Sequence, residues 1–184
     1  MKASRVKGLR PGTRLGGAAL RITRQRVADL LAFDEAVRDP GNVRELHDLR
    51  IAAKRLRYTL EVLGSVLGPA ATVVEDEARA LQALLGEVHD CDVLTPRLER
   101  ELALLTAQDA LAVAALAESD PSATPRLVRE APGRAVRHGV QSLAVGVAAR
   151  RAVLYEQFLV RWDALLAGGA LSALTHPPAT DSAA

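Results

Sequence analysis

Residues 39–69 read DPGNVRELHDLRIAAKRLRYTLEVLGSVLGP, and this stretch decides the fold. The breaks Asp39-Pro40-Gly41 and Gly68-Pro69 bracket a segment with apolar residues at helical spacing. Asn42 followed three residues later by Glu45 has the spacing of a capping box, which favours a helix start at this point. The stretch therefore predicts one long amphipathic helix over residues 43–67.

The rest of the chain also has a helical composition. Only 3% of the 184 residues are aromatic, Ala and Leu abound, and β-branched runs are scarce. We expect further helices over about 18–38, through 81–95 to Pro96, onward to about 118, and over about 134–166. At Pro96 the chain should either kink or start a new helix. Another loop is expected at 119–125.

These elements predict an all-α protein, an antiparallel bundle of about five helices that includes long ones. By length the chain should form a single domain. We expect a flexible basic arm over residues 1–17, a helical domain over 18–170 and a disordered tail over 171–184. The first 26 residues carry eight basic side chains and no acid, so the local positive charge exceeds the net charge of +2.

Several classes of protein are disfavoured by what the sequence lacks. A single cysteine, Cys91, excludes an internal disulfide and indicates a cytoplasmic protein. No apolar run reaches the length of a membrane span, and no export signal follows the basic amino terminus. The glycine motifs of phosphate loops, dinucleotide-binding turns and hydrolase nucleophile elbows are missing.

The predicted helix 43–67 has two separate stripes. At about 100° per residue, one sector about 80° wide contains four basic or titratable side chains, with Tyr58 and Glu61 near its edges. These four are His47, Arg50, Lys54 and Arg57. A second sector of similar width, centred about 120° away, contains Leu49, Ala53, Leu56, Leu60 and Leu63. The helix can bury the second stripe and present the first.

Two other predicted helices repeat the basic pattern. Arg21 and Arg24 share a face near the amino terminus, and Arg134, Arg137 and His138 lie at the start of the last helix. If the three stripes converge, they form a site for an anion with many regularly spaced charges, whose affinity falls with salt. The alternative is that each stripe is a solvated face paired with neighbouring helices.

His89 and the nearby acids Asp90 and Asp92 are the remaining candidates for chemistry. His89 and Asp92 are three residues apart and so lie close together on a helix. A zinc site needs three or four ligands, and the sequence offers no third one nearby. We therefore expect a histidine oriented at a helix contact, with Gly86 permitting a close approach, and neither a metal nor another cofactor.

The segments 47–58, HDLRIAAKRLRY, and 81–93, LQALLGEVHDCDV, together resemble the CHAD family, the conserved-histidine α-helical domains. A weaker similarity lies in 150–162, so the resemblance covers most of residues 18–170. It implies a helical bundle whose basic surface or pore binds inorganic polyphosphate. The family's basic motif falls on His47, Arg50, Lys54, Arg55 and Arg57, and its second motif falls on Gly86, His89, Asp90 and Asp92.

The resemblance further implies that Asp90 and Asp92 orient basic side chains rather than touch phosphate. Many members contain two similar helical halves, whereas this chain has one copy of each motif, so we expect two chains to associate as a homodimer.

Non-catalytic polyphosphate binding is the leading functional prediction. The predicted contacts are Arg21, Arg24, His47, Arg50, Lys54, Arg55, Arg57, Tyr58, His89, Arg134, Arg137 and His138. Because His47 gains charge in mild acid, binding should tighten there. Nucleic-acid binding is less favoured because stacking aromatics are few. A metal-dependent phosphohydrolase using His47, His89, Asp90 and Asp92 is the enzymatic alternative.

Overall fold

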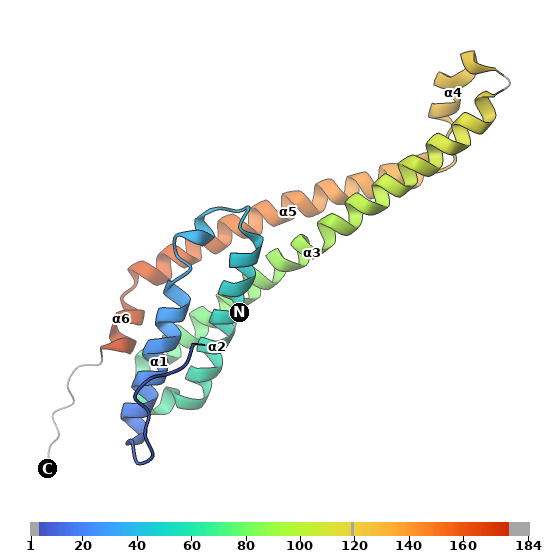
Figure 1. Cartoon of the computed structure of the whole chain (residues 1–184). Helices are drawn as coiled ribbons and strands as arrows, with labels where there is room; N and C mark the ends of the chain where they lie inside the picture. The colour runs from blue at the N-terminus through green and yellow to red at the C-terminus, as the bar shows by residue number, and fades with distance from the viewer. Residues whose placement is uncertain (1–3, 119, 177–184) are drawn as a thin grey trace, which may run out of the picture. The chain divides into compact units, whose positions relative to one another are not determined.

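The computed structural model describes residues 4–118 and 120–176 and is all-α there, as predicted (Figure 1). Within these ranges the chain forms α-helices and two short 3₁₀ helices, and no strand. The helices are α1 (Leu15–Leu31), η1 (Ala36–Arg38), α2 (Val43–Leu67), α3 (Pro69–Ala117), η2 (Pro121–Ala123), α4 (Thr124–Arg129), α5 (Arg134–Ala167) and α6 (Ala170–Thr175).

The chain divides into two compact units, and both boundaries fall inside long helices. The first unit comprises residues 1–89 and 154–184, and the second comprises residues 90–153. Helix α3 passes from the first to the second after His89, and α5 returns before Leu154. Because the units share these helices, the expected single domain over residues 18–170 stays a prediction.

The first unit has a well-packed apolar core. It packs α1, α2, the start of α3, the end of α5 and α6 together (Figure 1). The side chains of Leu49, Leu56 and Leu60 from the predicted apolar stripe of α2 are buried, whereas Leu63 is half-buried. Phe158 and Trp162 of α5 are fully buried, with ring centroids 6.2 Å apart.

Residues 32–42 connect α1 to α2 and are held by the end of α5. Trp162 Nε1 donates a hydrogen bond to Asp34 Oδ1 (2.8 Å), and the Tyr155 hydroxyl donates to the Val37 carbonyl (2.9 Å). The expected capping box is wrong: Asn42 precedes α2 but makes no side-chain cap, because its Nδ2 donates instead to the Ala36 carbonyl (2.8 Å).

The second unit is built on an antiparallel pair formed by α3 and α5. Ion pairs join Arg151 to Asp92 and Arg137 to Asp109. Residue numbers therefore increase along α3 as they decrease along the facing part of α5. On α3 the buried positions of this unit are Cys91, Leu98, Asp109 and Val113, and the steps of seven and four residues within this set are spacings of one helix face. Helix α4 lies at the connection between the two long helices (Figure 1).

Four boundaries differ from the sequence predictions. Helix α1 spans 15–31 rather than 18–38, because contacts with α5 hold the following residues as turns. Residues 15–17 of the expected arm are therefore helical. The expected start of a new helix at Pro96 is wrong, since α3 runs through it, and the alternative of a kink stays a prediction. The expected loop at 119–125 contains η2 and the first residues of α4; residue 119 lies outside the described residues.

The expected disordered tail is wrong over residues 171–175. These form most of α6, and Leu171 and Leu174 are buried against the first unit, which supplies the apolar contacts that the short segment needs to be helical. Beyond His176, the rest of that predicted tail, residues 177–184, lies outside the described residues. No helix in the described part of the chain is long and apolar enough to cross a membrane.

Candidate functional site

The basic stripe of α2 lies along the first part of α3, within the first unit. The rings of His47 and His89 are in contact, with centroids 4.7 Å apart. One turn further along α2, Arg50 packs over Gly86, where an added Cβ would lie 3.6 Å from Arg50 Nε. We call His47, Arg50, Lys54 and Arg57 of α2 the cation row. Its members are three or four residues apart in the sequence, so they lie along one face of α2.

Arg50 is a half-buried cation that lacks a carboxylate partner among the described residues. Its Nε is buried and has no hydrogen-bond acceptor in the part of the chain that the structure describes. Two other half-buried arginines are neutralised: Arg26 pairs with Asp29 (2.9 Å), and Arg151 pairs with Asp92. A charge that is partly removed from water and has no counter-charge is energetically costly. A bound anion would lower this cost at Arg50.

His47 adds a second polar group without a partner. Its Nδ1 is buried and has no hydrogen-bond partner within residues 4–118 and 120–176. The ring is tilted by 44° to that of His89. Two imidazoles in contact beside a guanidinium form a polar cluster at the end of the cation row, and this fulfils the prediction that His89 is oriented at a helix contact.

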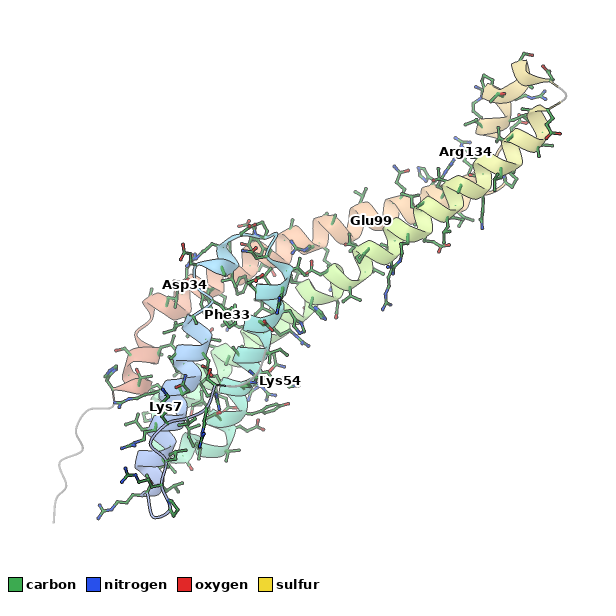
Figure 2. All side chains as sticks on the ribbon, in the orientation of Figure 1. Lys7, Phe33, Asp34, Lys54, Glu99 and Arg134 are labelled. Atoms are coloured by element: carbon green, nitrogen blue, oxygen red, sulfur yellow. The ribbon has the colours of Figure 1, made fainter. Side chains whose placement is uncertain are left out.

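Lys54 is the exposed member of the cation row, whereas Arg57 at its other end is half-buried. Figure 2 shows Lys54 projecting away from α2. Arg57 Nε donates to Gln82 Oε1 of α3 (3.1 Å), and its Nη1 lies 3.4 Å from Glu61 Oε2. Arg57 Cζ and Lys54 Nζ lie over the Tyr58 ring, 4.2 Å and 5.8 Å from its centroid. These contacts orient Arg57 and leave Lys54 without an ion pair within the described chain.

Arg55 does not lie on the cation row. It is about 140° from Arg50 around the helix, so it faces the opposite flank of α2. The family motif includes both residues because they are close in sequence, but the helix separates their side chains. A ligand that follows the cation row therefore lies on a different side of α2 from Arg55.

The two basic residues predicted on α1 have protein partners. Arg21 Nη1 donates to the Gly8 carbonyl (2.7 Å), and Arg24 Nε donates to the Thr175 carbonyl (2.6 Å). The second bond satisfies a carbonyl in the last turn of α6, where a cation is also favoured by the helix dipole. Both arginines therefore have structural roles, and their contact with a ligand stays a prediction.

The third predicted stripe belongs to the second unit. Arg137 Nη1 lies 3.3 Å from Asp109 Oδ2, and Arg134 Nη1 donates to the Arg129 carbonyl (3.2 Å). Arg134 is labelled near the start of α5 in Figure 2, and His138 is exposed one turn later. This unit contains eight arginines and eight carboxylates, so its formal charge is zero. The convergence of the three stripes stays a prediction.

Asp90 and Asp92, the acidic pair after His89, lie in different environments. Asp92 pairs with Arg151, which confirms for this residue the expectation that it orients a basic side chain. Asp90 is exposed. Between them, burial raises the pKa of the Cys91 thiol. Within the ranges described, no three side chains of the metal-binding types gather closely enough to hold an ion.

The comparison with family models matches the CHAD domain over residues 21–184. The chain belongs to the CHAD domain family. The match to this CHAD domain spans both compact units and includes every residue of the cation row. Neither the curated proteins nor the solved structures gave a match.

Sequence reasoning missed two partners of the site. Gln82 lies in the second CHAD motif and is spaced four and seven residues from Gly86 and His89, so helical spacing could have indicated that it faces α2. Arg151 lies 59 residues from Asp92, and no local pattern connects them. Their pairing depends on the register of two helices that the sequence does not specify.

Proposed function

We propose that this CHAD domain binds inorganic polyphosphate along the cation row and performs no chemistry on it. The observation that carries the proposal is Arg50, a half-buried guanidinium without a carboxylate partner in the described chain, placed in line with Lys54 and Arg57. Membership of the family supports the proposal, because CHAD domains are known for polyphosphate binding.

The dimensions of the row favour a chain-like anion over a single ion. At about 1.5 Å per residue, the row from His47 to Arg57 extends over about 15 Å of helix. One phosphate group can contact only a neighbouring pair, whereas a linear polyanion can contact all members together. Arginine and lysine both bind phosphate oxygens, and Arg50 can do so with two donors in parallel.

The composition of the surface disfavours single-stranded nucleic acid as the ligand. All five aromatic residues lie in the described chain, and only Tyr58 is exposed. Arg57 already occupies a position over its ring. Since binding of single strands usually depends on several aromatic stacking contacts, the row offers phosphate contacts and little else.

The experiment is a competition titration at physiological salt between long-chain polyphosphate and single-stranded DNA of equal charge. The natural chain is compared with Arg50→Ala/Arg57→Ala and with the charge-matched control Arg97→Ala/Arg100→Ala, which changes exposed arginines of the second unit. We expect a preference for polyphosphate that only the first variant loses. Equal binding of both polymers, or equal loss in both variants, would refute the proposal.

Two further expectations belong to this proposal. Incubating polyphosphate with the protein and Mg²⁺ or Mn²⁺ should release no orthophosphate, whereas metal-dependent release would restore the phosphohydrolase alternative. We also propose a homodimer acting in the cytoplasm, motivated by the single copy of each motif and by the single cysteine. Light scattering that gives the mass of one chain while binding is intact would contradict the dimer.

A further inference from the structure

The second unit contains a cavity that is separate from the cation row. It has a volume of about 400 Å³ and is bordered by α3, α4, the residues just before α5, and the first turn of α5. Its walls are mainly aliphatic, formed by Ala110, Val113, Ala114, Ala117 and Val128. Such a size and lining are typical of sites for small molecules with a hydrocarbon body.

A polar pair lies at the wall of this cavity. The side chain of Asp109 is only 5% exposed, and its Oδ1 accepts a hydrogen bond from the Gly133 amide (2.7 Å). Its Oδ2 accepts no hydrogen bond from the described residues, although Arg137 Nη1 lies 3.3 Å away as an ion-pair partner. Asp109 is therefore a buried carboxylate whose second oxygen lacks an aligned donor, a costly arrangement in an apolar surrounding.

Asp109 is held in a fixed position and makes one end of the cavity polar. A Cβ at Gly133 would lie 2.6 Å from Asp109 Oδ1, so only glycine permits this approach of the carboxylate to the chain before α5. Arg137 also borders the cavity, and its Nε and Nη2 have no carboxylate or carbonyl partner among the residues described. The pair thus presents an acceptor and donors side by side.

We propose that this cavity binds a small uncharged molecule with a compact hydrocarbon body and one group that both donates and accepts a hydrogen bond, such as a primary carboxamide. The ligand's N–H would donate to Asp109 Oδ2, and its carbonyl would accept from Arg137. An uncharged ligand is favoured because Asp109 and Arg137 already neutralise each other. The hydrocarbon body would fill the space between α3 and α4.

The test uses the full ¹⁵N-labelled chain and the Gly133 amide signal, since this amide is bonded to Asp109. Three probes share one ring: cyclohexanecarboxamide, cyclohexyl methyl ketone, which cannot donate, and cyclohexanecarboxylate, which is charged. We expect saturable Gly133 shifts with the carboxamide, at a Kd on the order of 0.1–1 mM for a ligand of this size. The ketone and the carboxylate should bind at least several-fold more weakly.

Two variants separate the cavity from the surface. Ala114→Phe fills the cavity and should remove the saturable shift, whereas Ala115→Phe adds the same group at an exposed position that does not border it. Polyphosphate binding should be unchanged in both, which distinguishes this site from the cation row. Absence of saturation with the carboxamide, or equal affinity for all three probes, would overturn the proposal even if the variants failed to fold.

Discussion

The salt dependence of polyphosphate binding provides the sharpest test of the cation row. We consider the triple change Arg50→Ala/Lys54→Ala/Arg57→Ala. For a single-stranded polyanion, each neutralised charge contributes roughly 0.7 to the slope of log K against log salt. Three lost contacts should therefore reduce the slope by roughly 2. At 0.1 M salt each contact is worth roughly five-fold in affinity, so the triple change should weaken binding by roughly 100-fold.

The assay is fluorescence anisotropy with end-labelled polyphosphate of one length at several KCl concentrations between 50 and 400 mM. Arg97→Ala/Arg100→Ala/Arg129→Ala removes the same number of charges from exposed positions of the second unit. This control should change the slope by less than 0.5. If both triple variants lost the same slope, general basicity rather than the row would explain binding. A weaker affinity with an unchanged slope would show that these side chains do not contact phosphate.

Three other measurements test the surrounding structure. The hydrogen bond from Trp162, followed by the interaction with Arg38, lowers the pKa of Asp34. The stability that the Asp34 carboxylate contributes is therefore present above its unfolded-state pKa and is lost as pH falls through its folded-state pKa. Trp162→Phe should therefore lower the free energy of unfolding by about 1–3 kcal/mol at pH 7 and by less at pH 3, measured by urea unfolding. An equal loss at both pH values would contradict this role of the hydrogen bond. Gly86→Ala should raise helix stability by about 1 kcal/mol and leave polyphosphate affinity unchanged, because the added Cβ would only touch Arg50. Gly86→Leu should instead weaken polyphosphate binding. If both variants had equal effects in the anisotropy assay, the close approach of Arg50 to Gly86 would be unimportant for binding. Since burial raises the pKa of Cys91, a disulfide reagent should modify it far more slowly in the folded chain than in urea, and equal rates would mean that the thiol is accessible.

Helix α2 could be predicted from the sequence because its limits are local. The proline and glycine residues that flank 43–67 stop a helix wherever they occur, and the structure gives the same bounds. The end of α1 could not be predicted, because Asp34 is held by Trp162 from 128 residues away. Helix α6 was missed for a related reason, since its stability comes from burial of Leu171 and Leu174 rather than from its own sequence.

The candidate site was predictable to the extent that it lies on one helix. The spacing of His47, Arg50 and Arg57 indicated a shared face, and in the structure all three contact the second motif on α3. The partners of Arg24 and Arg137 could not be predicted, because they depend on tertiary packing. A count of basic residues therefore overestimates the charge available to a ligand.

The regular spacing of the cation row has a kinetic consequence. Neighbouring cations on α2 are three or four residues apart, so a bound chain can exchange one contact while it keeps the others. Such a chain can slide along the helix in short steps, and a second chain can replace it contact by contact. If polyphosphate binds along the row, its release should therefore be faster when free polyphosphate is present than after simple dilution.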